Sequence, residues 1–331
     1  MADISIHQIS KAFGTTQAVS DVTLRVDDGA FVVLLGPTGA GKTTILRLIA
    51  GLEHPDTGDV RINDHSVISQ TPAQRDVAMV FQQYSLYPHM TVRDNLAFPL
   101  RSPILQTPEA EIARKIHEVA EVLSISHKLD NKATALSGGE MQRVSIGRAL
   151  VRDPSVYLMD EPLSSLDAKL RADLRVELKR IHASLGSTLL YVTHDQIEAM
   201  TMATQIGVLD EGRLVQFGIP REIYENPTSL YVAGRLGSPR INALPASLFP
   251  DAPAGAATIG LRPEHIHHGD GQAAKVIRVE PLGDQTRLHL QLQGHDIVTL
   301  TDPHTNLEPD DTIAIQPRNP LYFDAAGDRI V

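Results

Sequence analysis

The sequence predicts an α/β protein with a mostly parallel sheet, followed by a small all-β domain. Three observations support this fold class: a glycine-rich loop between a buried strand and a helix, strands that alternate with helices up to about residue 235, and short strand-like segments beyond it. Alternating strands and helices favour a parallel sheet covered by helices. With 331 residues the chain is long enough for two domains, which we expect at residues 1–235 and 236–331.

The first half of the expected α/β domain begins with β-prone segments. Ile4 to Val26 alternates short β-prone runs with polar turns, and Phe31 to Leu35 is an apolar run typical of a buried strand. A helix is expected from Thr43 to Ala50, ending at Gly51. The order is therefore strand, glycine loop, helix.

A largely helical region follows from about Thr91 to Arg152, interrupted by prolines and by the turn at residues 137–139. A strand is expected at Val156 to Met159. A helical stripe of leucines and isoleucine spans Ala168 to Leu185, and the strand Thr188 to Val192 comes next.

Beyond about residue 237 the pattern changes to short alternating segments typical of strands. Ala274 to Val279, Thr286 to Leu292 and Thr312 to Gln316 are short alternating segments separated by Pro, Gly and Asp. This pattern predicts the small all-β domain.

Composition excludes several classes of protein. The net charge of -10 disfavours a nucleic-acid-binding protein, because such domains carry a basic face. The chain has no cysteine, so neither disulfides nor thiolate metal sites are possible. Its start lacks the pattern of a signal peptide, and no apolar run approaches the ~18 residues of a spanning helix. We expect a cytosolic protein whose membrane partner, if any, is another chain.

The glycine loop matches the phosphate-binding pattern G-x-x-x-x-G-K-[ST] and has the strand and helix that the pattern requires. Its backbone amides and the helix N-terminus can receive a β-phosphate, Lys42 can reach the β and γ oxygens, and the Thr43 hydroxyl can ligate Mg²⁺. A nucleoside triphosphate is the expected ligand, and a chance glycine turn is the disfavoured alternative. The predicted ATP-binding residues of the loop are Gly36, Pro37, Thr38, Gly39, Ala40, Gly41, Lys42, Thr43 and Thr44.

Two carboxylates, Asp160 and Glu161, end the expected strand at the edge where phosphates bind in α/β sheets. Asp160 suits a magnesium ligand, and Glu161 can polarise the water that attacks the γ-phosphate. Such a pair alone is usually a solvated strand end. Here Gln82, residues 164–167 and His194 occupy comparable strand-end or loop positions, which makes a structural role for all of them improbable.

The segment at residues 136–143, Leu-Ser-Gly-Gly-Glu-Met-Gln-Arg, resembles the signature motif of ABC transporter ATPases. The resemblance implies an antiparallel β subdomain and a helical signature subdomain beside the parallel sheet. It also implies that Gln82 is the Q-loop glutamine, which takes part in catalysis and in holding the metal. His194 is implied as the switch histidine, residues 164–167 as the D-loop, and Phe13 as the aromatic that stacks on adenine.

Active sites in this family are composite, so ATP lies between the phosphate loop of one copy and the signature motif of another. The resemblance therefore implies a homodimer with ATP and Mg²⁺. The residues that would contact the other copy's ATP are Ser137, Gly138, Gly139, Glu140 and Asp167.

The resemblance is nearest to the maltose-type carbohydrate importers and covers almost the whole chain, including the segments at residues 81–89, 192–201, 237–239 and 260–265. It implies a C-terminal TOBE or OB-like domain that is regulatory. It also implies two transmembrane permease subunits that contact about Gln83 to Phe98, a periplasmic solute-binding protein, and a peripheral position on the cytoplasmic face of the bacterial inner membrane. Core packing is an alternative reading of Gln83 to Phe98.

One residue departs from the family pattern, because Glu140 stands where glutamine is usual. Its charge should repel the γ-phosphate of a second copy's ATP. However, Ser137-x-x-Glu140 also fits a capping box, in which the carboxylate turns back to the Ser137 amide. We therefore hypothesise that the site remains active.

Other functions stay open at this stage. A soluble ABC ATPase acting on DNA or ribosomes would usually carry a long coiled coil or two ATPase halves, and neither heptads nor an internal repeat is present. A binding or regulatory role of the C-terminal domain is a further possibility. The solute itself remains open among oligosaccharides, monosaccharide derivatives, polyols and glycerol phosphodiesters.

Overall fold

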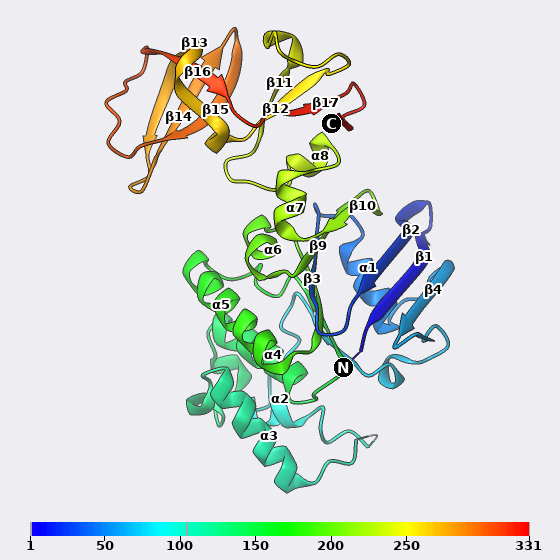
Figure 1. Ribbon diagram of the computed structural model, residues 1–331. Helices are drawn as coiled ribbons and strands as arrows, with labels where there is room; N and C mark the ends of the chain where they lie inside the picture. The colour runs from blue at the N-terminus through cyan, green and yellow to red at the C-terminus, as the bar shows by residue number, and fades with distance from the viewer. Residues whose placement is uncertain (1, 104, 331) are drawn as a thin grey trace. The chain divides into compact units, whose positions relative to one another are not determined.

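The computed structural model describes residues 2–103 and 105–330, and the chain divides into two compact units, one ending at Pro220 and one beginning at Arg221 (Figure 1). The expected domains at 1–235 and 236–331 stay predictions, because compactness alone does not show where an independently folding domain ends.

A six-stranded sheet forms the centre of the first unit, in the order β10-β9-β3-β8-β7-β6. Five of the strands are parallel and β10 pairs antiparallel with β9 at one edge. The strands are β3 (Phe31–Leu35), β6 (Val77–Val80), β7 (Val156–Asp160), β8 (Thr188–Thr193), β9 (Gln205–Asp210) and β10 (Arg213–Gly218). Parallel strands end at a common edge, so the residues after β3, β6, β7 and β8 are brought near one another.

A second, antiparallel sheet of the same unit has the order β2-β1-β4-β5. Its strands are β1 (Ile4–Phe13), β2 (Thr16–Val26), β4 (Thr57–Ile62) and β5 (His65–Ser66). The N-terminal stretch, expected as short runs between turns, is two strands of 10 and 11 residues. Polar positions within it are bulges: Gln8 has a φ of 48° where the register between β1 and β2 shifts.

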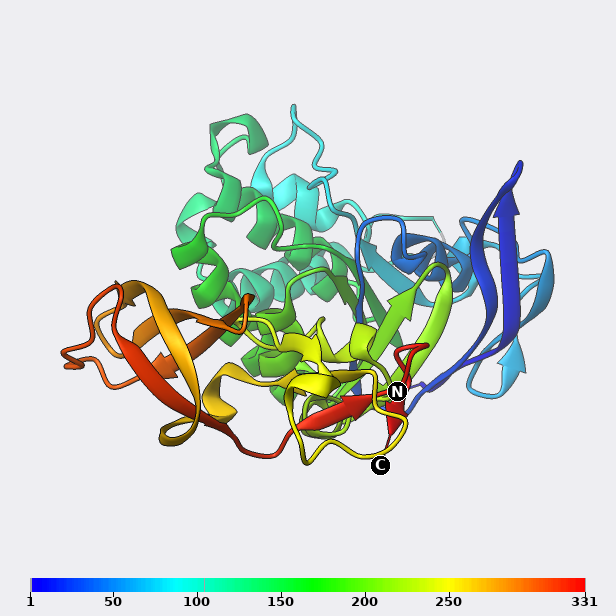
Figure 2. The same cartoon turned by 90° about the horizontal axis from the view of Figure 1, so that it is seen from above.

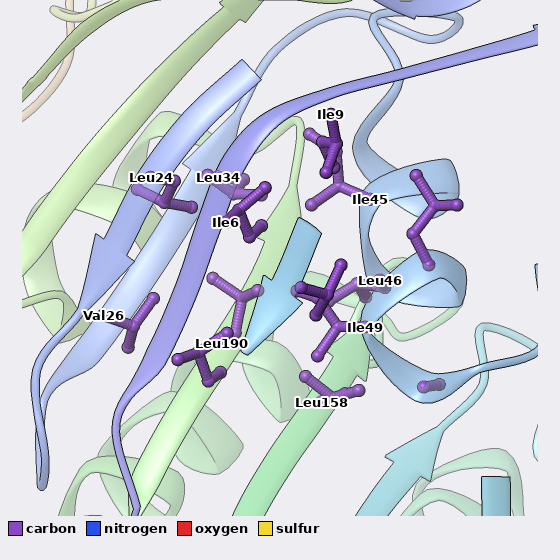
Figure 3. Close-up of a cluster of buried hydrophobic side chains, with 14 of the residues drawn as sticks. Ile6, Ile9, Leu24, Val26, Leu34, Ile45, Leu46, Ile49, Leu158 and Leu190 are labelled. Carbon is purple, nitrogen blue, oxygen red and sulfur yellow. The ribbon is translucent and has the colours of Figure 1, made fainter. Parts of the chain in front are cut away.

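The core of the first unit lies between the two sheets and helix α1 (Lys42–Ala50). Figure 3 shows Ile45, Leu46 and Ile49 of α1 pointing toward side chains of both sheets, among them Ile6 of β1 and Leu158 of β7. All five side chains are fully buried. Their burial fixes the start of α1, and with it the loop that precedes the helix.

Four of the remaining helices of the first unit fall in the predicted helical regions, and the helix at Gln196–Met202 was not predicted. Prolines limit them as expected, since Pro108 is the residue before α3. Short 3₁₀ turns occur at Pro72–Gln74, Ser126–Lys128 and Ala133–Ala135. The helices are α2 (Val92–Ala97), α3 (Glu109–Val122), α4 (Gly138–Leu150), α5 (Ala168–Leu185) and α6 (Gln196–Met202).

The second unit begins with the short helices α7 (Pro220–Glu225, which starts at the last residue of the first unit) and α8 (Leu230–Ala233) and continues as two four-stranded antiparallel sheets. Figure 2 shows these strands in yellow to red. One sheet contains β11 (Asn242–Pro245), β12 (Thr258–Leu261), β17 (Leu321–Phe323) and β18 (Arg329–Ile330). The other contains β13 (Ile266–Pro281), β14 (Thr286–Leu292), β15 (His295–Thr301) and β16 (Thr312–Pro317).

The all-β character predicted for this region is confirmed, with short 3₁₀ turns at Ala246–Leu248 and Pro263–His265. The expected strand Ala274 to Val279 is part of the longer β13, which has a bulge between His268 and Gln272. Alternate residues of β14 point into one apolar core, which accounts for the alternation in the sequence.

Within the described residues, no helix is both long enough and apolar enough to cross a bilayer.

Candidate ATP-binding and hydrolysis site

The phosphate loop runs from the end of β3 into α1 and is held in place by close backbone packing. Gly36 lies against Leu209 of β9, where a side chain would come within 2.8 Å of the Leu209 carbonyl oxygen. Gly41, directly before α1, has a φ of 93°, and a Cβ there would lie 2.4 Å from the Ala18 carbonyl oxygen. Position 41 therefore accepts only glycine, because a side chain would meet both the left-handed backbone and the Ala18 carbonyl. Both glycines are structural requirements of the loop.

Lys42 is the first residue of α1, and its side chain is 5 % exposed. Its Nζ donates to the carbonyl oxygens of Gly36 at 3.0 Å and Pro37 at 2.9 Å, and lies 3.4 Å from Oε1 of Glu161. The ammonium group is therefore held across the loop, on the side that faces the end of β7. A cation in this position can contact the β and γ oxygens of a triphosphate.

Thr43 and Asp160 meet between α1 and β7. The Thr43 hydroxyl donates to Oδ1 of Asp160 at 2.9 Å, and Asp160 is 5 % exposed. Burial raises the pKa of the Asp160 carboxyl, while the hydrogen bond from Thr43 acts in the opposite direction. A hydroxyl and a carboxylate together are the hard oxygen ligands that Mg²⁺ prefers, so these two residues fit the predicted metal site.

Glu161 follows β7 with a φ of 43°, a left-handed backbone that is uncommon for a residue with a side chain. The conformation is fixed on both sides: the Glu161 amide donates to the Val192 carbonyl at 3.0 Å, and the Ser164 hydroxyl donates to the Glu161 carbonyl at 2.9 Å. It directs the carboxylate to His194, whose Nδ1 lies 2.9 Å from Oε2 of Glu161. Lys42, Glu161 and His194 thus form a connected group.

Glu198 of α6 was not predicted as part of this region. It is 2 % exposed and accepts hydrogen bonds from the hydroxyls of Tyr191 at 2.8 Å and Thr193 at 2.6 Å. Burial raises the pKa of the Glu198 carboxyl. These contacts fix the end of β8 directly before His194. The sequence signal is a glutamate three residues after the capping Asp195, which also reads as a solvated helix start.

The signature turn begins α4 with Ser137 at the N-cap position. The predicted capping box is present: the Ser137 amide donates to Oε2 of Glu140 at 2.9 Å, and the Glu140 amide donates to the Ser137 hydroxyl at 3.4 Å. Gly139 packs on Leu170 of α5, and Gly138 lies near the Tyr84 hydroxyl. Among the described residues, no hydrogen bond or ion pair joins residues 137–140 to the phosphate loop.

Within the part of the chain that the structure describes, three other predicted site residues also form no hydrogen bond or ion pair with the phosphate loop. Phe13 ends β1, is 46 % exposed, and has Lys11 Nζ 5.4 Å from its ring centroid. Gln82 is exposed and follows β6, beside the end of β7. Asp167 caps α5 by accepting from the Leu170 amide at 3.0 Å.

The segment from Gln83 to Phe98 lies on the surface of the first unit. It contains buried side chains of α2, namely Val92, Leu96 and Ala97, beside less buried ones: Tyr84, Leu86, Tyr87 and Met90 are half-buried, and Phe98 is 44 % exposed. A cavity of about 110 Å³ adjoins it, lined among others by Phe81, Tyr84, Pro99 and Arg148. Core packing, the alternative considered for this segment, accounts for the buried side chains of α2, and the half-buried ones keep part of their surface accessible.

Comparison with known families agrees with this geometry. Residues 19–164 match the family described as ABC transporter, and residues 259–320 match the TOBE domain. The first match contains the phosphate loop, the signature turn and the acidic pair, and the second lies in the all-β unit. The predicted fold class, a phosphate-loop α/β domain followed by an all-β domain, is confirmed.

Curated relatives match over the whole chain. The chain is 44 % identical to the sn-glycerol-3-phosphate import ATP-binding protein UgpC of Rhizobium meliloti, with 100 % of both chains covered. It is 41 % identical to the sulfoquinovosyl glycerol transport ATP-binding protein SmoE of Agrobacterium fabrum, again with 100 % of both covered.

A solved structure with the same α/β fold is a dimeric bacterial ABC transporter cassette, MJ0796. It has a TM-score of 0.60 and 28 % identity, and the alignment covers 66 % of this chain and 99 % of that one.

Proposed function

This chain belongs to the ATP-binding subunits of ABC transporters, and we propose that two copies of it drive the import of a sugar or sugar-derived solute through two membrane subunits. Membership of the family confirms the predicted ATPase activity and ATP as its ligand. The observation that carries the rest of the proposal is the arrangement of Lys42, Asp160, Glu161 and His194 at one sheet edge, without the signature turn that the family's chemistry requires.

The triphosphate would lie along the loop from Gly36 to Thr44, at the N-terminus of α1. Converging backbone amides and the helix dipole favour an anion there, and the Lys42 ammonium adds a positive charge. Thr43, Asp160 and Gln82 would hold Mg²⁺, which neutralises phosphate charge when bound. Phe13, exposed at the end of β1, would stack on the adenine.

Glu161 would accept the proton of the attacking water. Its carboxylate is only 14 % exposed, and its backbone is fixed by Val192 and Ser164, so the position of the base is set before ATP binds. His194 would orient the water or the γ-phosphate through its ring nitrogens. Assistance by a general base is typically about 10²- to 10⁴-fold in rate.

The signature turn would complete the site of a second copy. Ser137 is exposed at the N-terminus of a 13-residue helix, where backbone amides and the helix dipole favour an external phosphate. Residues 137–140 and Asp167 would therefore contact ATP bound to the partner's phosphate loop. This arrangement explains why one copy would hydrolyse ATP poorly.

The segment from Gln83 to Phe98 would receive a membrane subunit. Its partly exposed aromatic side chains and the adjoining cavity suit a short amphipathic helix, which would bury its apolar face there. The protein would then be peripheral, on the cytoplasmic face of the bacterial inner membrane, and would meet a periplasmic solute-binding protein only through the permease.

The solute class follows from the relatives, whose names specify sn-glycerol-3-phosphate and sulfoquinovosyl glycerol. We propose a sugar or a polar glycerol derivative as the solute. The specificity would lie in the membrane subunits and the binding protein, because the groups at the ATP site recognise phosphate.

Reconstitution tests this function. The protein, copurified with its permease pair and placed in proteoliposomes, should hydrolyse ATP faster when the binding protein is loaded with its solute. Uptake of labelled solute should require ATP on the side of this subunit. An ATPase rate that is independent of the loaded binding protein would contradict the importer assignment.

A further inference from the structure

The charge of Glu140 is the one feature of the signature turn that the proposed composite site does not explain. Glu140 is the third residue of α4, at the helix end that would meet the partner's ATP. Two anions brought close together repel one another, and the repulsion is weakly screened once water is excluded. A free carboxylate here would oppose closure of the dimer on ATP.

Lys128 supplies a counter-charge. Its Nζ lies 3.1 Å from Oε1 of Glu140, and the side chains of Lys128 and Glu140 are 27 % and 26 % exposed. Oε2 of Glu140 accepts from both the amide and the hydroxyl of Ser137, at 2.9 Å and 3.0 Å. Both oxygens of the carboxylate are therefore occupied within the same chain.

The backbone around Lys128 holds its side chain at this position. Lys128 ends the 3₁₀ turn Ser126–Lys128; its amide donates to the Ile125 carbonyl at 2.9 Å, and its carbonyl accepts from the Asn131 amide at 2.9 Å. Ile125 and Leu129, on either side of the turn, are buried. The turn is thus anchored in the core, and the pair with Glu140 is a local contact between two fixed segments.

The acidity of Glu140 agrees with these contacts. The hydrogen bond from the Ser137 amide, followed by the contacts with Lys128 and the Ser137 hydroxyl, holds the pKa of the Glu140 carboxyl below its usual range. Glu140 is therefore ionised at neutral pH, and its charge must be balanced by a cation rather than removed by a proton.

We propose that Lys128 is a positioning residue for ATP hydrolysis: it neutralises Glu140 and holds the carboxylate against Ser137, so that the N-terminus of α4 faces the partner's ATP without an unbalanced negative charge. The inference rests on the proposed composite site. It assigns a role to a lysine nine positions before Ser137 in the sequence, outside the signature motif.

The test compares the Lys128→Met substitution in two backgrounds of the purified transporter. With Glu140 present, Lys128→Met leaves a negative charge facing the partner's ATP, and KM for ATP should rise about fivefold with a smaller change in kcat. With Glu140→Gln present, no charge remains to be balanced, and Lys128→Met should change KM less than about twofold. The increase in KM should also shrink as ionic strength is raised.

Two controls separate charge from structure. Lys128→Arg keeps the cation and should retain a KM near that of the parent. Lys132→Met removes an exposed lysine four residues along the chain for which no ion pair is formed within the described residues, and it should leave KM unchanged. Equal effects of Lys128→Met in both backgrounds, or a lower melting temperature with an unchanged KM, would overturn the proposal.

Failure of the composite site itself gives a different result. Ser137→Arg should abolish turnover if the signature turn completes the partner's site. If Ser137→Arg retains full turnover, the composite site and the role of Lys128 both fail. If it is inactive while Lys128→Met acts equally in both backgrounds, only the role of Lys128 fails.

Discussion

Nδ1 of His194 lies 2.9 Å from Oε2 of Glu161, and the other oxygen of the same carboxylate lies 3.4 Å from Lys42 Nζ. The pairing of β7 with β8 brings Glu161 and His194 together, since Glu161 follows the end of β7 and His194 follows the end of β8. The carboxylate thus joins the phosphate-binding lysine to the histidine. It is the group through which we expect the hydrolysis step to be controlled.

Substitution of Glu161 by Gln should separate binding from hydrolysis. The amide keeps the shape of the side chain but cannot accept the proton of water, so turnover should fall about 10²- to 10⁴-fold while ATP still binds. Phosphate release gives the rate, and light scattering with ATP should reveal a trapped dimer. Undiminished turnover would remove Glu161 from the mechanism.

Asp160→Asn should stabilise the ligand-free protein at neutral pH. Because burial raises the folded-state pKa of Asp160, its ionised form is less stable in the folded protein than in the unfolded chain. Protonated Asp160 contributes to the free energy of unfolding, and this contribution is fully present below the unfolded pKa of about 3.9. As pH rises through the folded pKa, the buried carboxyl ionises and the contribution is lost. The asparagine variant avoids that loss.

Thermal unfolding without nucleotide checks this prediction. The melting temperature of Asp160→Asn should exceed that of the parent at pH 8, and the difference should shrink as pH falls toward 5. Added Mg²⁺ with ATP should stabilise the parent more than the variant. A variant that melts below the parent at pH 8 would contradict the account.

Glu198 should matter for stability through the hydroxyls that it accepts. Glu198→Ala leaves the buried hydroxyls of Tyr191 and Thr193 without their acceptor, at a cost of about 1–3 kcal/mol for each group. Glu198→Gln can still accept through its amide oxygen and should lose much less. Urea denaturation of both variants measures the difference, and equal losses would show that the hydrogen bonds are not responsible.

Arg262 should stabilise the second unit. It is 2 % exposed, and its guanidinium carbon lies 3.8 Å from the centroid of the Tyr224 ring. Its guanidinium donates to three backbone carbonyl oxygens, those of Ala233 at 3.1 Å, Tyr224 at 2.8 Å and Leu236. Arg262→Met leaves these buried carbonyls unpaired and should cost about 2–4 kcal/mol.

Hydrogen exchange measures this loss of stability: the amides near Tyr224 and Ala233 should exchange faster in Arg262→Met than in the parent protein. The matched control is Arg240→Met, because Arg240 is exposed and forms no hydrogen bond or ion pair within the described residues. Equal exchange in both variants would contradict the role of Arg262.

Much of the fold follows from local signals in the sequence. The loop from Gly36 to Thr44 lies where a buried strand and an amphipathic helix meet, and β14 was predicted with its observed ends because every second residue is apolar. The full length of β1 and β2 was not predicted, because a bulge such as that at Gln8 has the polar pattern of a turn in the sequence.

The contacts of the site depend on long-range packing. The link between Glu161 and His194 joins residues 33 positions apart, and that between Thr43 and Asp160 joins residues 117 apart. The role of Glu198 depends on its burial, and that of Lys128 depends on the turn that brings it to Glu140. Neither leaves a recognisable pattern in the neighbouring sequence.

The central claim, that each ATP site combines two copies, is tested most directly with a tethered dimer of the Glu161→Gln protein. Lys42→Ala disables a phosphate loop and Ser137→Arg disables a signature turn. Placed in different copies, the two changes should leave one complete site and one trapped ATP per dimer; placed in the same copy, they should leave none. One trapped ATP with both changes in the same copy, and none when they are separated, would show that each chain forms its own site and would contradict the account.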